Sequence, residues 1–264
     1  MNLNIIFALL FASTVSIISY YFKLLTKSGA VSAFIIGSLI FSLGQFKWGI
    51  PLVTFFMFSS LLSRSGENHK KKFETIFYKS TQRDYGQVIA NGGLGAILVI
   101  SNLFIKNELP YLIYIGSISA VCADTCATEI GTMRNTDTYN ILNFKKTKQG
   151  TSGGVSLAGS SGALLGAIIV AASALFWIHL NIIYYFCLIV FAGLSASFID
   201  SILGAAFQSQ NKCLVCGQIT EKKVHCEKLT KHYKGLKFLN NDVINFLAAL
   251  SGSIIVYFIN EIAK

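Results

Sequence analysis

The chain has 264 residues, of which 53% are hydrophobic and only 13% are charged, and its formal net charge is +10. A soluble domain of this size carries about a quarter charged residues, so the composition excludes an ordinary soluble protein and indicates an integral membrane protein. The positive charge would also suit a nucleic-acid-binding protein, but basic loops beside membrane spans explain it without nucleic acid.

Eight apolar segments are the predicted helices: 3–22, 28–45, 48–63, 87–105, 111–131, 154–177, 182–208 and 243–260. A helix needs about 20 residues to cross the hydrocarbon core, so the third segment is short for a span. No segment alternates apolar and polar residues as a barrel strand does. The first lacks the basic start and the cleavage site of a signal peptide, so we expect it to be retained. The prediction is an all-α, polytopic membrane helix bundle that forms a single domain over residues 1–264.

The basic residues separate to one side of this bundle. Eight spans put four loops on the same side: 23–27, 64–86, 132–153 and 209–242. These loops hold 19 of the 22 Lys and Arg residues, and only Lys47, Lys106 and Lys264 fall elsewhere. The positive-inside rule therefore predicts that the basic loops are cytoplasmic and that both termini lie on the non-cytoplasmic side. Such loops also suit anionic headgroups, so we expect membrane lipids as partners and no nucleic acid.

Polar side chains inside or beside the apolar segments are few. Burying an ionisable group in hydrocarbon costs several kcal/mol, so such groups usually face a protein interior or a wet cavity where they function. The set comprises Asn91, Asp124, Glu129, Asp200, Asn241, Asp242 and Asn245. Under this topology each lies toward the cytoplasmic end of its segment. We therefore expect one site at the cytoplasmic face rather than a relay through the membrane.

Asp124 and Glu129 belong to the run ADTCATEIG over residues 123–131. Five residues correspond to about 140° around a regular helix, so the two carboxyl groups do not share a face. Either the helix is distorted near Gly131 or the two acids serve different partners. We expect Asp124 to bind a metal ion, with Glu129 as a second ligand or as a clamp on a lysine. A buried Asp–Lys pair that only fixes packing is the structural alternative.

The run KKTKQGTSGGVSLAG, residues 145–159, leads into the sixth apolar segment. Lysines, glycines and the backbone N–H groups of a helix start together favour an anion. The run is not the P-loop sequence G-x-x-x-x-G-K-[ST], and small residues such as Gly159, Gly162 and Gly166 also pack membrane helices. Beside converging acids, which can hold Mg²⁺, the run predicts a polyphosphate site. Its candidate binding residues are Lys146, Lys148, Gly150, Thr151, Ser152, Gly153 and Gly154.

A cysteine and histidine pattern, C-x2-C-x8-H-C, falls in the last basic loop. Its members are Cys213, Cys216, His225 and Cys226. Four such ligands can close a tetrahedral structural zinc site, and a reducing compartment argues against disulfides. The spacing matches no standard zinc finger, because adjacent His and Cys residues rarely both reach one metal. Structural zinc and free thiols therefore both stay open.

Five motifs in order resemble one known family: GQVIANGG (86–93), ADTCATEIG (123–131), GTSGGVSLAG (150–159), SFIDSILGAAFQ (197–208) and NNDVINFLAAL (240–250). They are similar to domain-of-unknown-function family 92 (DUF92), the transmembrane protein 19-like proteins, over nearly the whole chain. One plant branch of that family is understood as phytyl-phosphate kinase. The run DTCATEIG followed by KKTKQGTSGG is also distantly similar to the CTP-dependent polyprenol and dolichol kinases.

The resemblance implies a nucleotide-dependent kinase, with CTP favoured, that converts an isoprenoid monophosphate to the diphosphate at the cytoplasmic membrane face. Catalysis would then fall to Asp124, Glu129, Asp200 and Lys148. Mg²⁺ would be held by Asp124, Glu129, Asp200 and Asp242. The phosphates would contact Lys146, residues 150–154, Asn91, Asn241 and Asp242.

Two other functions stay open. A membrane transporter or flippase for a lipid or a small anion would also suit eight spans with buried acids. Transporters often show inverted repeats and midplane sites, however, and neither is evident here. A CTP-dependent lipid cytidylyltransferase would share the chemistry of Mg²⁺ and CTP but release pyrophosphate. The sequence leaves open the lipid, the nucleotide base and the oligomeric state, a homo-oligomer included.

Overall fold

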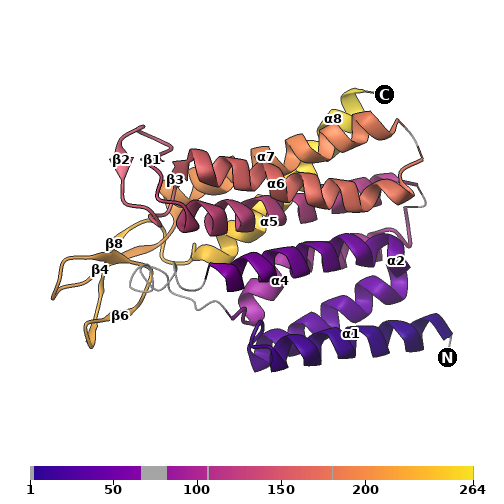
Figure 1. The fold of residues 1–264 in the computed structure, drawn as a ribbon, viewed down its shortest axis with the longest axis horizontal. Helices are drawn as coiled ribbons and strands as arrows, with labels where there is room; N and C mark the ends of the chain where they lie inside the picture. Colours follow the sequence, from indigo (N-terminus) through magenta and orange to yellow (C-terminus); the bar gives the residue numbers. More distant parts are fainter. Residues whose placement is uncertain (1–2, 67–81, 106, 180, 264) are drawn as a thin grey trace.

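The computed structural model describes residues 3–66, 82–105, 107–179 and 181–263. Its helices are α1 (Leu3–Tyr21), α2 (Lys27–Ser65), α4 (Tyr85–Ser101), α5 (Leu109–Met133), α6 (Leu157–Ala174), the 3-10 turn η2 (Leu175–Trp177), α7 (Ile182–Phe207) and α8 (Asn241–Ile262). They lie side by side in one bundle, with both termini at the same end (Figure 1). Among the described residues, α2 and α5–α8 are long and apolar enough to cross a membrane, with η2 extending the α6 segment, and α1 and α4 are shorter apolar helices.

Helix α2 contains both the second and the third predicted segments. It is broken at Gln45, whose φ of 53° and ψ of −151° are not helical. The two halves fold back on each other there, at the end of the bundle that carries the termini (Figure 1). A residue with positive φ reverses the chain within a single position, so the two halves need no separate loop. The prediction of two apolar segments therefore holds in substance, within one interrupted helix.

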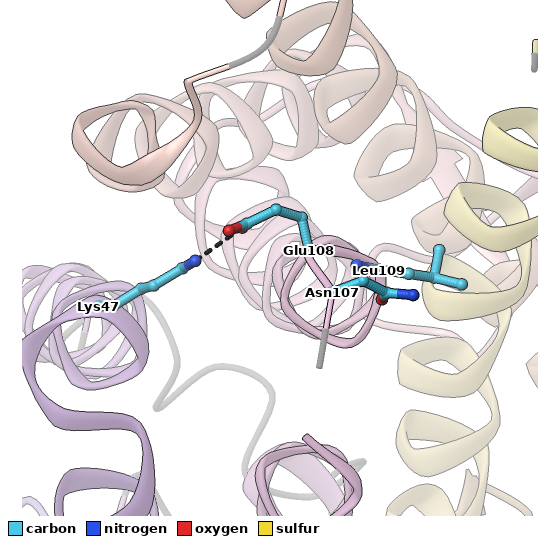
Figure 2. A network of polar contacts seen from close by, with 4 residues as sticks. All are labelled: Lys47, Asn107, Glu108 and Leu109. Carbon is cyan, nitrogen blue, oxygen red and sulfur yellow. Dashed lines mark hydrogen bonds and ion pairs between the residues drawn. The ribbon is translucent and has the colours of Figure 1, made fainter. Parts of the chain in front are cut away.

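Polar contacts tie this reversal to the beginning of α5. Lys47 Nζ lies 2.7 Å from Glu108 Oε2 and 4.5 Å from the centre of the Tyr111 ring. Figure 2 shows the ion pair bridging α2 and the start of α5. At that start, Asn107 Oδ1 accepts a hydrogen bond of 3.0 Å from the Leu109 amide, which satisfies an unpaired N–H of the first turn.

Helix α5 is the centre of the bundle and packs against α2, α4, α6, α7 and α8. Small residues bring α6 very close to it: a Cβ at Gly162 would lie 2.6 Å from the Cys126 carbonyl oxygen, and one at Gly166 would lie 2.6 Å from that of Cys122. The packing role expected for these glycines is therefore confirmed. Cys122 and Cys126 are fully buried between the two helices.

Short strands occupy two of the loops, which the all-α prediction did not include. The loop after α5 contains β1 (Thr138–Asn140), β2 (Lys146–Thr147) and β3 (Gly154–Ser156), with strand order β2-β1-β3. Residues 208–240, here called the loop module, contain β4 (Gln210–Lys212), β5 (Ile219–Thr220), β6 (Val224–His225), β7 (Lys228–Leu229) and β8 (Lys231–Lys234). The module forms the sheet β5-β4-β8 and the hairpin β6-β7.

Both sets of strands extend from the end of the bundle opposite the termini (Figure 1). All the pairings in them are antiparallel and only two to four residues long, so they add rigidity to the loops without forming a separate core. Most of the predicted basic loop 64–86, namely residues 67–81, lies outside the described residues.

Candidate functional site

A cavity of about 800 Å³ lies where the helices meet these two loops. Its volume is within the range of small-molecule sites, about 300–1,000 Å³. Most of the predicted site residues line it: Asn91, Asp124, Glu129, Gly150, Thr151, Ser152, Gly153, Gly154, Asp200, Asn241 and Asp242. They come from α4, α5, α7, α8 and the glycine-rich loop, so the fold brings together residues that are up to about 150 positions apart.

Asp124 of α5 and Asp200 of α7 both line this cavity. Their carboxyl groups are within hydrogen-bonding reach of one another. Asp200 Oδ1 and Asn91 Oδ1 are buried and accept no hydrogen bond from the described part of the chain. Two carboxylates in contact repel each other unless they share a proton or a cation, and Mg²⁺ prefers oxygen ligands of this kind. The donor set of the cavity therefore fits a magnesium ion.

Glu129 faces a different partner, because it lies on another side of α5. Its Oε1 accepts a short hydrogen bond from Ser63 Oγ of α2, and the side chain is 3% exposed. The nearby Arg83 guanidinium attracts it electrostatically. The structure therefore supports the explanation that Asp124 and Glu129 have different partners, rather than a distortion of the helix.

Arg83 is held rigidly at this point. It is only 8% exposed, and its guanidinium donates to Ser60 Oγ at 2.7 Å and to Ser59 Oγ at 3.0 Å. Its backbone pairs with the turn before α2, accepting from the Thr26 amide at 3.0 Å. Burial in these surroundings lowers the pKa of Arg83, and Glu129 opposes that shift. The cavity thus has a fixed cation that the sequence interpretation missed.

The glycine-rich segment is a turn before β3 rather than the first turn of α6. Helix α6 begins at Leu157, and Ser156 Oγ caps it by accepting from the Gly159 amide at 3.1 Å. The prediction placed the glycines at the start of this helix, and that placement is wrong. The first turn of α6 also has a side-chain cap, because Ser156 Oγ accepts from one of its amides. In the turn itself, the amides of Ser152 and Gly153 form no hydrogen bond within the described residues and both residues line the cavity.

Gln149 and Gly153 fix this turn in place. Gln149 Nε2 donates to the carbonyl oxygens of Gly131 and Arg134, which end α5. Gly153 has a φ of +77°, and a Cβ there would lie 2.2 Å from the Ala205 Cβ of α7. The turn is therefore clamped between the ends of α5 and α7 and lines the same cavity as Asp124 and Asp200.

Lys146 and Lys148 are not brought to the cavity. Lys146 Nζ is 2.6 Å from Asp137 Oδ1, and the hydrogen bond and charge of that carboxylate raise the pKa of the lysine. Lys148 is exposed and does not line the cavity. The cations that do line it come from elsewhere: Arg83, Lys222, Lys223 and Lys237. The closeness of a lysine to the glycines in the sequence did not predict whether it lines the cavity. Three of the lining cations belong instead to the basic loop 209–242.

An apolar cavity of about 90 Å³ adjoins the polar one. Phe11, Ile36 and Phe55 are among the side chains of α1 and α2 that line it. Arg83 and Asn91 line both cavities, so a charged head and an apolar tail could be bound side by side.

Cys213, Cys216, His225 and Cys226 gather in the loop module, outside the polar cavity. Their ligand atoms all lie within 4.8 Å of one another. The adjacent His and Cys residues therefore do reach one point, which the spacing made doubtful.

Several known proteins are similar in sequence to this chain over almost its full length. The family model described as "Integral membrane protein DUF92" matches residues 10–253. Protein PGR of Arabidopsis thaliana is 30% identical over 271 residues, which cover 94% of this chain and 93% of that protein. An uncharacterized membrane protein of Methanocaldococcus jannaschii is 27% identical and covers 88% and 84%. Protein VTE6, chloroplastic, of Arabidopsis thaliana is 23% identical and covers 90% and 66%. No solved structure matches.

Proposed function

Because this chain belongs to the DUF92 family of integral membrane proteins, we propose that it is a kinase that phosphorylates an isoprenoid monophosphate. The resemblance to the plant branch of this family that is understood as phytyl-phosphate kinase supports this class of reaction. The likeness to polyprenol kinases favours CTP as the phosphoryl donor. The observation that carries the proposal is the contact of Asp124 and Asp200 inside a cavity that Arg83, Lys222, Lys223 and Lys237 also line.

Side chains of both charges line the cavity. The helices contribute the acids Asp124, Asp200 and Asp242, while the loop module contributes Lys222, Lys223 and Lys237 together with the acid Glu221. A nucleoside triphosphate with Mg²⁺ needs both kinds of group, carboxylates for the metal and cations for the phosphates. A site for a free anion would need only the cations.

In this proposal Asp124, Asp200 and Asp242 hold Mg²⁺, which neutralises charge on the nucleotide phosphates when bound. The lysines of the module and the amides of residues 152–153 bind the terminal phosphoryl group and align it. An oxygen of the prenyl monophosphate forms the new P–O bond as the bond to the nucleoside diphosphate breaks. The acceptor is already an anion, so no strong general base is needed.

Arg83 and Asn91 would bind the acceptor phosphate, because they line both cavities. The apolar cavity of α1, α2 and α4 would receive the first part of the prenyl chain. Glu129 would stabilise the charge of Arg83 rather than bind metal in this arrangement, since its Oε1 accepts from Ser63 Oγ and its carboxylate attracts the Arg83 guanidinium.

We also propose that the chain crosses the membrane eight times, counting the two halves of α2 separately, with the cavity facing the cytoplasm and both termini outside. The basic loops 23–27, 132–153 and 209–242, which lie at the cavity end, support this orientation through the positive-inside rule. A cytoplasmic site would give the enzyme direct access to nucleotide.

Purified protein incubated with labelled CTP, Mg²⁺ and a set of prenyl monophosphates tests the activity. We expect a prenyl diphosphate and a nucleoside diphosphate in equal amounts. Release of pyrophosphate instead would identify a cytidylyltransferase. Absence of product with every nucleotide and lipid pair, from protein that remains folded, would overturn the proposal.

Asp124→Asn tests the metal role at the level of one residue. The change keeps the shape but removes a charge in contact with Asp200, so we expect turnover to fall at least about a hundredfold. Asp137→Asn is the matched control, because Asp137 is an exposed partner of Lys146. It should retain wild-type turnover. Full activity of Asp124→Asn would remove this residue from the metal site.

A further inference from the structure

The loop module carries a second candidate site, formed by Cys213, Cys216, His225 and Cys226 and here called the Cys3His cluster. His225 Nδ1 lies 3.5 Å from Cys216 Sγ and 3.2 Å from Cys226 Sγ. All four ligand atoms lie within 4.8 Å of one another, and all three cysteines are free thiols. Three thiols cannot all pair as disulfides within one chain, so the cluster is poorly explained as a redox pair.

These separations suit a tetrahedral zinc ion. With Zn–S bonds of about 2.3 Å and Zn–N bonds of about 2.0–2.1 Å, a nitrogen and a sulfur ligand lie about 3.6 Å apart and two sulfurs about 3.8 Å apart. Both observed nitrogen–sulfur distances lie just below the first value, by at most about 0.4 Å. Thiolate and imidazole ligands favour Zn²⁺ over Mg²⁺ or Ca²⁺, which take oxygen ligands.

The first half of the cluster is a tight turn built around a sulfur. Cys213 directly follows β4, and its Sγ accepts a hydrogen bond of 3.4 Å from the Val215 amide. The Gly217 amide closes the turn on the Cys213 carbonyl oxygen at 3.0 Å, and Gly217 has a φ of +73°. Amide donors to a sulfur stabilise its thiolate form, which is the form that binds metal.

The second half stores backbone strain. His225 pairs with Lys228, so Cys226 and Glu227 form the two-residue turn of the β6-β7 hairpin. Their φ values are 50° and 59°. A turn with two positive φ angles favours Asn-Gly, so a cysteine and a glutamate in these two positions are strained. The strain has a use if Cys226 must face the same point as its neighbour His225.

The loop module has little else to hold it together. Among residues 208–240, all of which are described, Cys213 is the only buried apolar side chain. Leu214, Val224 and Leu229 are 69%, 53% and 74% exposed. Strands of two to four residues without a core are only marginally stable, and small domains of this kind often depend on a metal.

We propose that the Cys3His cluster binds one structural Zn²⁺ ion, and that this ion holds residues 221–223 against the polar cavity. These residues lie between the two halves of the cluster, so the ion fixes both ends of the segment. Gln208 Nε2 donates to Glu221 Oε1 at 2.8 Å, and the Thr230 amide donates to the Lys223 carbonyl oxygen at 3.0 Å. The consequence for nucleotide binding rests on the proposed function, but the zinc site does not.

Metal analysis of the purified full-length protein tests the site independently of activity. We expect about one zinc per chain from protein prepared in reductant, and X-ray absorption with three sulfur ligands and one nitrogen ligand. Cys216→Ser should lose the zinc. Cys187→Ser is the matched control, because this exposed thiol of α7 is outside the cluster, and it should keep the zinc. Less than about one tenth of an equivalent in zinc-supplemented wild type, or full zinc in Cys216→Ser, would overturn the proposal.

Hydrogen exchange tests whether the ion holds this segment in place. The experiment uses the wild-type protein, so it does not depend on the folding of a variant. A zinc-selective chelator should speed amide exchange in peptides covering residues 210–232 at least about tenfold, because without the ion the two halves of the cluster are no longer connected. Exchange in α5 should stay unchanged. Unaltered exchange of residues 210–232 after complete zinc removal would show that the ion does not position this segment.

Discussion

Replacing Gly153 by alanine tests whether the glycine-rich turn is clamped as closely as the structure indicates. The residue has a φ of +77°, and a left-handed conformation costs an L-residue about 1–2 kcal/mol. The new Cβ would also lie 2.2 Å from Ala205 Cβ and 2.7 Å from Ala205 Cα. Because the second atom belongs to the backbone of α7, the turn must move, at about 1–3 kcal/mol for overpacking. The combined penalty is about 2–5 kcal/mol.

Thermal unfolding in detergent measures this penalty, and nucleotide protection measures its effect on the cavity. For a chain of this size about 2–4 °C is lost per kcal/mol, so we expect Gly153→Ala to melt well below the wild type. Added nucleotide with Mg²⁺ should no longer raise the melting temperature. Gly93→Ala is the matched control in α4, since its Cβ would meet Ile89 Cγ2 at an ordinary 3.4 Å. A Gly153→Ala protein that melts and binds like the wild type would refute the clamped turn.

Two further predictions concern the cations of the cavity and the packing of α5 against α6. Lys223→Gln should raise the KM for nucleotide about tenfold or more, since a charge-assisted hydrogen bond contributes about 1.5–3 kcal/mol. Lys146→Gln should leave the KM unchanged, because Lys146 is exposed and paired with Asp137. Equal effects of the two in steady-state kinetics would contradict this assignment of the cations. Gly162→Val should lower the melting temperature by separating α5 from α6, because even a Cβ would lie 2.6 Å from the Cys126 carbonyl oxygen; wild-type melting would show that the contact is looser.

The helices could be predicted from the sequence because apolar runs of about 20 residues have few other structures open to them in a membrane. The predicted segment 111–131 and α5 (Leu109–Met133) differ by only two residues at each end. The strands could not be predicted in the same way. Segments such as β2 (Lys146–Thr147) contain two residues and pair only because β1 lies next to them, so they depend on tertiary context rather than on local pattern.

The acids of the site were predictable because a carboxylate in an apolar segment is conspicuous and has few harmless explanations. The cations were not, because a lysine in a loop is unremarkable wherever it points. Lys146 follows the acidic helix closely in sequence yet pairs with Asp137, whereas Lys223 is almost 80 residues further on and lines the cavity. Gln149 was missed for a related reason, since hydrogen bonds to the carbonyl oxygens of a helix end leave no trace in composition.

The interior beyond the cavity bears on the choice between a kinase and a transporter. A transporter must open its site in turn to both ends of the bundle. From the cavity toward the opposite end, α5 is buried on nearly all sides, and Tyr111 and Tyr114 are 1% and 0% exposed. Tyr114 Oη donates to the Trp48 carbonyl oxygen at 2.6 Å, beside the reversal of α2 at Gln45. Opening a path would break this contact and separate close-packed rings, whereas chemistry at a cavity open to one side requires no such change. The packing of the far half of the bundle therefore favours an enzyme.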